Sequence, residues 1–475
     1  MKKTLFCLFI ALVCLLTVAG CTGGGTEDTA KSGYEIEFSL EENTLNCRQT
    51  VDFVNVYSDG LEEIKFNLYM NAYAEDAVDK AYATPLKTYG GTEITALKIN
   101  GNDASFTLSE NKLSFSVPVD SLKLGDRAEI YMEYTVTLPE CDLRTGYSDG
   151  YYNLSNFYPQ IAVYGEEGFL SDAYSAVGDP ILSDVADFSV KATFDEHLVA
   201  ATPALGTETI AEGKKTISIR AENIRDFAMV LSDKFLCETA SDENLTVYYF
   251  HDGNEESAER ASLALDVLKT FSSVFGDYPY DTFTVASTPF AEEGMEFSGL
   301  VYIDNLTTDF EKTLIHETSH QWWYNLVGND NVREGWLDEG LTTFSTAYYY
   351  SLKGDEETFT EEIKSIRRSY ALYERSQKLR GDKGALNINV DIYSCTDYQY
   401  GMLAYNKSCL LFADLYEKAG KEKFEKALSY YVDDNRFRRA DSTSLADSFG
   451  KAMNCDVTGI IDGWLSDKAV VTTFA

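Results

Sequence analysis

The stretch TLIHETSHQWWYNLVG, residues 313–328, places two of the four histidines of this 475-residue chain four positions apart. Residues four apart on a helix lie on the same face, so His316 and His320 are able to share one metal ion. Glu317 lies beside them and can hold a water molecule next to that metal without being a ligand. This H-E-x-x-H spacing therefore predicts the metal-binding helix of a zinc peptidase.

Two histidines alone do not make a catalytic zinc site, which needs three protein ligands and one open position. The stretch GWLDEGLTTFSTAYYY, residues 335–350, supplies Glu339 nineteen residues after His320, at the start of another helical pattern. H-E-x-x-H by itself can also arise by chance, as a polar patch on a buried helix. With the downstream glutamate present, we expect His316, His320 and Glu339 to bind one Zn²⁺ ion.

Around this motif, the pattern divides the chain into two regions. Residues 34–243 are predicted to be a β domain, because apolar and polar residues alternate in segments such as EIEFSL, AEIYMEYTVTL and FSVKATF. Residues 244–475 begin with a helical pattern, return to strand and then become mainly helical. Thr308 or Asp309 is the expected N-cap of the helix with the two histidines.

The first residues are not expected to belong to the fold. Residues 1–20 combine Lys2 and Lys3 with an apolar run, which is the form of a secretion signal. Val-Ala-Gly before Cys21 resembles a bacterial lipobox, so Cys21 is the expected lipidated N-terminus of a membrane-anchored, extracytoplasmic protein. An ordinary cleaved signal or an N-terminal membrane anchor is the alternative. Residues 21–33 then form a flexible tether.

Composition excludes one class of partner. The formal net charge is -37, which repels a phosphate backbone, so we expect no nucleic acid partner. The charge is typical of a solubilising surface, and attraction of cationic peptides is a second interpretation. Six cysteines follow Cys21 at irregular spacings, which leaves both disulfides and buried free thiols open.

Taken with its neighbours, this motif resembles the aminopeptidase N family of gluzincin zinc peptidases, which includes the leukotriene hydrolase branch. GMEFSG at residues 294–299 resembles the family's G-x-M-E-N exopeptidase motif, and AYNKS at residues 404–408 resembles the segment with its catalytic tyrosine. RDFAMVLSDKF and FGDYPYDTF also look familial. The resemblance covers residues 35–470 and implies an α+β multidomain fold, with a saddle-like all-β domain before a thermolysin-like catalytic domain that is first mixed α/β and then mainly helical.

The resemblance also implies roles for individual residues. Glu317 would be the general base, and Tyr405 would donate a hydrogen bond to the oxyanion of the tetrahedral intermediate. Glu296 would bind the free α-ammonium group of a peptide substrate, and the backbone around Gly294 and Met295 would lie along that substrate. The alternatives are ordinary ones, since this chain has many surface carboxylates and 32 tyrosines.

Four further residues are weaker candidates. Asp338 is interpreted either as a residue that orients a ligand or as a helix cap. Tyr400 and Gln160 are interpreted as pocket residues or as packing, and Trp323 as packing.

Two substitutions and an early end distinguish the chain from the family pattern. Phe297 stands where the family has the asparagine of G-x-M-E-N, and Asn406 follows the tyrosine where a glutamate is common. We expect both to alter the pocket rather than the chemistry. GIIDGWLSDKA, residues 459–469, resembles the end of the catalytic domain, so we expect a form without the C-terminal helical domain and with a more open cleft.

The sequence thus predicts a zinc aminopeptidase that removes N-terminal residues from peptides outside the cytoplasmic membrane. One alternative is a zinc endopeptidase with an open cleft, in which Glu296 does not select the N-terminus. The other is a non-catalytic peptide-binding lipoprotein on a peptidase scaffold. The presence of Glu317 and Tyr405 argues against this last interpretation, because a dead enzyme is expected to lose such groups.

Overall fold

The computed structural model describes four segments of the chain, residues 30–170, 173–253, 256–381 and 386–466. The predicted signal, the predicted lipidation site Cys21 and most of the predicted tether lie outside the described residues. The described residues from Lys31 onward form one compact unit. Among the described residues, no helix combines the length and the apolarity that a bilayer span requires.

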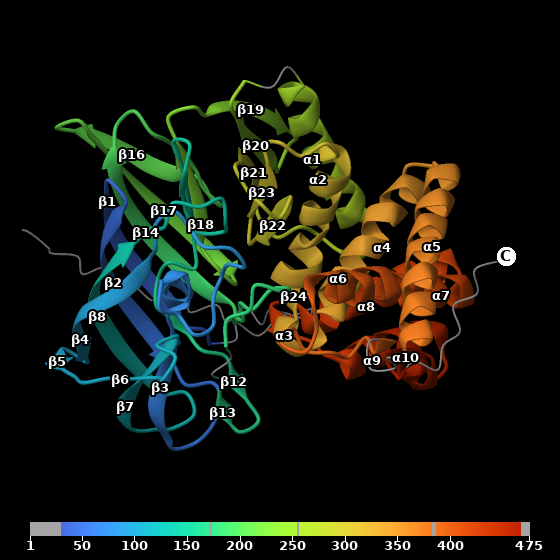
Figure 1. Ribbon diagram of the computed structural model, residues 1–475, viewed down its shortest axis with the longest axis horizontal. Helices are drawn as coiled ribbons and strands as arrows, with labels where there is room; N and C mark the ends of the chain where they lie inside the picture. Colours follow the sequence, from blue (N-terminus) through green and yellow to red (C-terminus); the bar gives the residue numbers. More distant parts are fainter. Residues whose placement is uncertain (1–29, 171–172, 254–255, 382–385, 467–475) are drawn as a thin grey trace, which may run out of the picture. The chain divides into compact units, whose positions relative to one another are not determined.

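A large twisted sheet dominates the first half of the chain (Figure 1). Its eight strands run in the spatial order β16-β17-β14-β1-β2-β8-β4-β5. Buried and exposed residues alternate along β1 and β8, as the sequence pattern predicted, so one face of the sheet packs on a core. The strands are β1 (Gly33–Glu41), β2 (Thr44–Val54), β4 (Gly91–Ile99), β5 (Asn102–Asp103), β8 (Arg127–Thr137), β14 (Ala186–Asp195), β16 (Gly206–Ala211) and β17 (Lys214–Ile224).

Smaller sheets complete this half. One has the order β15-β18-β10-β9, a second β11-β3-β7-β6, and β12 pairs with β13. Their bounds are β3 (Leu61–Asn67), β6 (Thr107–Leu108), β7 (Ser114–Leu122), β9 (Gly146–Ser148), β10 (Tyr151–Ser155), β11 (Gln160–Ile161), β12 (Tyr164–Gly165), β13 (Gly168–Phe169), β15 (Val199–Ala201) and β18 (Ala228–Ser232), with a 3₁₀ turn η1 (Tyr69–Tyr73) between β3 and β4.

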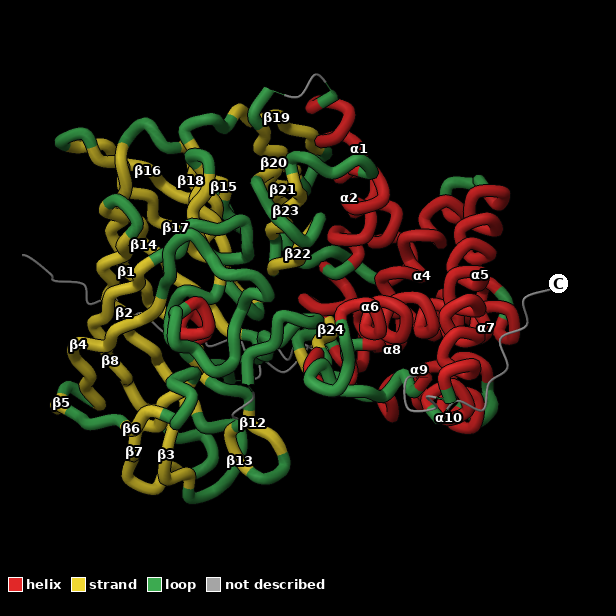
Figure 2. The backbone as a smooth tube through the Cα atoms, in the orientation of Figure 1, coloured by secondary structure: helices red, strands yellow, loops and turns green. Residues whose placement is uncertain are grey.

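A five-stranded mixed sheet begins the second half, in the order β19-β20-β21-β23-β22. Helices α1 and α2 lie beside it in Figures 1 and 2. The strand β19 pairs with β20 along its whole length, so this sheet begins before residue 244. The elements are β19 (Leu236–Ser241), β20 (Thr246–His251), α1 (Ser257–Phe275), β21 (Thr282–Thr288), β22 (Gly294–Phe297), β23 (Leu300–Asp304) and α2 (Phe310–Ser319).

After α2 the chain is mainly helical, as Figure 2 shows. Two π-helical turns, η2 and η4, interrupt the regular helices. The elements are η2 (Gln321–Leu326), β24 (Val327–Gly328), α3 (Asn331–Glu334), α4 (Trp336–Leu352), α5 (Glu356–Arg380), α6 (Asp397–Tyr400), η4 (Gly401–Lys407), α7 (Ser408–Ala419), α8 (Lys421–Asn435), β25 (Arg438–Arg439), α9 (Ser442–Met453) and α10 (Thr458–Leu465).

Separate cores stabilise the two halves, and a third apolar cluster joins them. In this third cluster, Ala228 and Val230 of β18 pack with Met295, Phe297 and Tyr302 of the five-stranded sheet. The fold is therefore the expected one, an all-β region followed by a mixed and then mainly helical region. The strand with the G-M-E-F motif is held directly against the β region.

Candidate metal and peptide site

The helix α2 presents both histidines of the motif. Its N-cap is Asp309, whose side chain accepts a hydrogen bond from the Lys312 backbone N–H, so one of the two predicted caps is the observed one. α2 ends beside His320, one turn after His316, and both rings therefore project from the same end of this helix.

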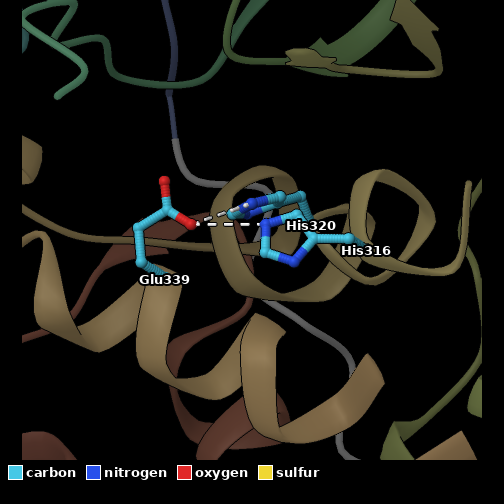
Figure 3. Close-up of side chains that lie close together, drawn as sticks. All are labelled: His316, His320 and Glu339. Carbon is cyan, nitrogen blue, oxygen red and sulfur yellow. Dashed lines mark ion pairs between the residues drawn. The ribbon is translucent and has the colours of Figure 1, made fainter. Parts of the chain in front are cut away.

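Glu339, in the first turn of α4, faces both imidazoles (Figure 3). Its Oε2 atom lies 3.4 Å from Nε2 of His316 and 3.6 Å from Nε2 of His320. Zinc bonds of about 2.0–2.2 Å at tetrahedral angles place ligand atoms about 3.4 Å apart. The three predicted ligands are thus brought together at the spacing that a tetrahedral metal ion requires.

The hydrogen bonds of the two rings leave the right nitrogen atoms for a metal. Nδ1 of His320 lies 3.0 Å from the Trp323 carbonyl, which only accepts, so Nδ1 carries the proton. Thr346 donates its hydroxyl hydrogen to the Thr342 carbonyl at 2.8 Å and therefore accepts from Nδ1 of His316 at 3.5 Å. Both Nε2 lone pairs consequently face Glu339 and can bind a metal.

Buried carboxylates also fit a divalent cation. Glu296, Glu317 and Glu339 are all buried, and Oε2 of Glu317 and of Glu339 has no hydrogen-bond partner within the described residues. Unpartnered carboxylate oxygen atoms are costly in a dry site unless a cation or a protonated group faces them. The donor set of two imidazoles and one carboxylate is typical of zinc.

The electrostatics of this pocket follow from burial. Burial raises the pKa of Glu296 to about 7, and it raises the pKa of Glu317 well above its usual range, with Glu296 adding to the effect. Burial also acts on Glu339, but the two adjacent imidazoles hold the pKa of this carboxyl at about 2. Glu339 is therefore the anionic ligand, and Glu317 is a carboxylate whose pKa favours uptake of a proton.

Glycine 294 allows the strand β22 to approach Glu317 closely. A Cβ atom at Gly294 would lie 2.4 Å from Oε1 of Glu317, so only glycine fits without displacing that carboxylate. Glu296, two residues further on, contributes a carboxylate oxygen within 4.8 Å of ligand atoms of Glu317 and His320. β22 is also an edge strand of its sheet, so its outer backbone groups are unpaired in the ladder.

The side chains on either side of Glu296 do not belong to the site. Met295 and Phe297 point to the opposite face of β22, where both are buried in the cluster that joins the halves. Phe297 packs its ring 4.7 Å from that of Tyr302. The expectation that Phe297 alters the pocket is therefore wrong, and any contact of Met295 with a substrate is limited to its backbone.

Tyr405 reaches the metal ligands from η4. Its hydroxyl donates to Oε1 of Glu339 at 2.6 Å, and its ring stacks on that of His316 with centroids 5.9 Å apart. Burial raises the pKa of Tyr405 well above its usual range, so the hydroxyl keeps its proton and remains a donor. The predicted tyrosine is thus next to the predicted ligands.

Of the weaker candidates, Asp338 and Tyr400 lie near the metal ligands and Gln160 does not. Oδ1 of Asp338 accepts the backbone N–H of Glu339 at 2.9 Å, so this carboxylate fixes the first turn of α4 beside the ligand. Tyr400 is buried, with its ring 6.0 Å from that of Tyr405. Gln160 is buried in β11, where it faces Asn67 of β3 and accepts from Asn156. None of the described contacts joins Gln160 to the metal ligands.

Sequence reasoning missed the residues that orient this site. Thr342 and Thr346 are three and seven positions after Glu339, a helical spacing that places them on its face of α4. That spacing was the available signal. Gln321 donates to the Phe297 carbonyl at 3.0 Å and accepts from the Gly299 N–H at 2.9 Å, which ties the end of α2 to β22. No local pattern predicts this long-range contact.

Comparison with known proteins agrees with the geometry. The model of the "Peptidase family M1 domain" matches residues 261–464. This match includes His316, Glu317, His320, Glu339 and Tyr405. Aminopeptidase 2 of Candida albicans is 23% identical over 399 residues, which are 78% of this chain and 42% of the relative. Aminopeptidase N of Lactobacillus delbrueckii subsp. lactis is 23% identical over 80% of this chain and 47% of its own length.

Solved structures show the same fold. An M1 zinc metallopeptidase from Deinococcus radiodurans superposes with a TM-score of 0.66 at 18% sequence identity, covering 93% of this chain and 96% of that one. The chain spans less than half the length of the two aminopeptidases named above.

Proposed function

We propose that this protein is a zinc-dependent aminopeptidase that removes N-terminal residues from peptides. The observation that carries the proposal is the convergence of three ligand atoms, from His316, His320 and Glu339. Two further buried carboxylates lie beside them, and they come from different elements. Glu317 follows His316 on α2, whereas Glu296 comes from the edge strand β22. One carboxylate is thereby available for proton transfer and the other for binding a cationic group.

Each residue has a distinct task in the proposed reaction. Zinc, when bound, acts as a Lewis acid that polarises the scissile carbonyl and lowers the pKa of water. Glu317 accepts a proton from the attacking water and delivers it to the departing amine. The Tyr405 hydroxyl donates a hydrogen bond to Oε1 of Glu339 at 2.6 Å. During the reaction this hydroxyl turns from Glu339 to the oxyanion, or it donates to both oxygen atoms at once.

Selection of the N-terminus is assigned to Glu296. Its carboxylate is 6% exposed, and an α-ammonium group that enters the pocket replaces the lost solvation of this buried acid. The unpaired edge of β22 offers backbone groups to an extended substrate, as strand addition requires. A blocked N-terminus would leave Glu296 without its partner.

The decisive experiment compares one peptide in free and Nα-acetylated forms, with purified zinc-loaded protein. We expect release of single N-terminal residues from the free form alone, and loss of that release in Glu296→Gln. Glu293→Gln is the control, because Glu293 is an exposed glutamate three residues earlier, just before β22. Internal cleavage of both peptide forms would instead identify an endopeptidase and overturn the role of Glu296.

A binding protein without turnover is the remaining alternative. It predicts full zinc occupancy, peptide binding and no hydrolysis of any member of a peptide library. The Glu317→Gln variant then has no phenotype, whereas the proposed mechanism predicts a loss of at least about 10²-fold in kcat with metal still bound.

We further propose that the protein acts outside the cytoplasmic membrane, anchored by a lipid on Cys21. The support is the charged, apolar and small-residue order of residues 1–20 immediately before Cys21. A Cys21→Ser variant should leave the membrane fraction while it keeps its activity on a soluble peptide. Retention of that variant in the membrane would contradict lipid anchoring at this residue.

A further inference from the structure

A buried charged pair from the β region contacts the end of the metal-binding segment. Arg225 and Asp226 follow β17 and precede β18, and each is only 2% exposed. The nearest metal ligand in sequence is His316, ninety-one residues later. Burial of both charges is costly, so the hydrogen bonds that they make must offset a large desolvation penalty.

Asp226 joins two separate parts of the site with its two oxygen atoms. Oδ2 accepts the hydroxyl hydrogen of Tyr324 at 2.6 Å, four residues after His320. Oδ1 accepts the backbone N–H of Ser298 at 2.9 Å, two residues after Glu296. One carboxylate therefore fixes the segment that follows the metal helix and the segment that follows the amine-binding strand.

The Arg225 side chain binds backbone carbonyl groups of the same turn. Its Nε donates to the carbonyl oxygen atoms of Tyr324 at 2.5 Å and Asn325 at 3.0 Å, and Nη2 donates to the Arg438 carbonyl at 2.7 Å. Gly328 makes room for this guanidinium, because a Cβ atom there would lie 2.4 Å from its Cζ. The planar fork of arginine suits several carbonyl groups at once.

The turn that they hold is not helical. Trp323 has φ -100° and ψ 57°, and Tyr324 has φ 170° and ψ -62°, so the chain leaves the helix at these two residues. This departure directs the Trp323 carbonyl onto Nδ1 of His320, at 3.0 Å. That contact fixes the tautomer and the orientation of the ligand ring.

We infer that Arg225 and Asp226 are positioning residues for the metal site: they hold the turn at Trp323 and Tyr324 so that its carbonyl orients His320. Asp226 also couples this turn to β22, and thus to Glu296. The effect on catalysis rests on the proposed function, whereas the effect on metal binding does not. The β region thereby contributes to the metal site without contacting the metal.

The test removes a single oxygen atom. Tyr324→Phe deletes the bond to Asp226 and keeps the ring, and Tyr349→Phe is the matched control. Tyr349 is 5% exposed, and its hydroxyl donates to Asp266 at 2.6 Å. This tyrosine–aspartate bond is as short as that of Tyr324 and lies away from the metal ligands. The Tyr324 bond is buried and the Tyr349 bond is partly buried, so both variants are expected to lower the melting temperature, Tyr324→Phe by more.

Metal affinity separates the two variants. We expect Tyr324→Phe to bind Zn²⁺ about tenfold more weakly in competition with a chromophoric chelator, and to shift the visible spectrum of the Co²⁺-substituted protein. Tyr349→Phe should match the wild type in both measurements. On a hydrolysed peptide, Tyr324→Phe should lower kcat with little change in KM.

Wild-type zinc affinity and an unchanged Co²⁺ spectrum in Tyr324→Phe would overturn the inference, whatever its melting temperature. Asp226→Asn provides a second variant. Its amide oxygen still accepts from the Ser298 N–H, but an NH2 group replaces the oxygen that accepts from the Tyr324 hydroxyl, so it should show the same loss of affinity. If no peptide is hydrolysed by any variant, the proposed function fails, but the affinity measurement still decides the role of Arg225 and Asp226.

Discussion

At the scale of single residues, the geometry of the site depends on a few close contacts between atoms rather than on the number of charged groups. Gly294 has no side chain where β22 meets Glu317, and the Thr346 hydroxyl fixes the tautomer of His316 by its own donation to a carbonyl group. Such contacts set which atom faces the metal and where the base lies. They are sensitive to changes of a single atom.

The Gly294→Ala substitution should therefore displace the base without removing any functional group. The added Cβ meets Glu317 Oε1, Cδ and Cγ at 2.4–2.7 Å, so the carboxylate must move. We expect kcat to fall by about 10²-fold, because small misplacements cost this much, with zinc affinity unchanged. Gly463→Ala, at a glycine of α10 with open space around its Cβ position and no positive φ, tests whether any glycine loss has this effect.

Tyr405→Phe should lower kcat by about 10²–10³-fold, as loss of one donor to an oxyanion does. Its hydroxyl also donates to Glu339, so a weaker effect on metal affinity is expected. Steady-state kinetics on zinc-saturated protein separates the two effects. Tyr398→Phe, an exposed tyrosine seven residues earlier, should behave as the wild type. Equal kcat values for Tyr405→Phe and wild type would exclude the tyrosine from the reaction.

At the scale of elements, the helices place each ligand by simple periodicity, and the irregular turns orient it. The sequence predicted α2, an N-cap at Thr308 or Asp309, and the position of Glu339 at the start of a helix, because capping and helical spacing are local properties. It did not predict the non-helical backbone at Trp323 and Tyr324. QWWYNL contains no glycine or proline, and the conformation depends on Arg225, which lies a hundred residues away.

The direction of Phe297 was missed for a related reason. Its neighbours identify a motif, but the face that each residue occupies depends on the register between β22 and β23. In that register Glu296 faces the metal ligands, and the residues beside it face the apolar cluster. Motif resemblance singled out Glu296 as a candidate, whereas the strand pairing determined which side chains face the metal ligands.

A half-buried carboxyl group in α3, that of Glu334, makes stability depend on pH. Burial, with Asp441 and Asp330 nearby, raises the pKa of Glu334 to about 7. Because the folded-state pKa lies above the unfolded value, this group stabilises the fold at low pH, and that stability is lost as the pH rises through about 7. Glu334→Gln stays neutral, so it should be more stable than the wild type by about 1 kcal/mol at pH 8, after discounting for partial solvation.

Urea unfolding at pH 4.5 and pH 8.5 measures this difference. The two proteins should have similar free energies of unfolding at the lower pH and diverge at the higher one. An exposed glutamate on α5, Glu357, is the control position, and Glu357→Gln should not alter the dependence on pH. A constant offset between Glu334→Gln and wild type at both pH values would contradict the assignment.

At the scale of the whole molecule, metal binding is linked to folding, because the three ligands come from two helices that only the folded chain brings together. Saturating zinc at a hundred times the dissociation constant should stabilise the protein by about 2.7 kcal/mol relative to the chelator-treated form. Differential scanning fluorimetry would record this as a concentration-dependent rise in melting temperature. His320→Ala should abolish the rise, and an equal rise in that variant would place the metal elsewhere.

The sheet order has a practical consequence for dissecting the protein. A fragment beginning at residue 244, where the sequence suggested a boundary, would omit β19 and leave the backbone edge of β20 uncovered. Exposed edges of this kind recruit strands from other molecules and favour aggregation. Even a fragment beginning at Leu236 would lack Arg225 and Asp226. Either fragment should therefore be insoluble or poorly metallated when expressed alone, and recover when the β region is supplied as a separate polypeptide.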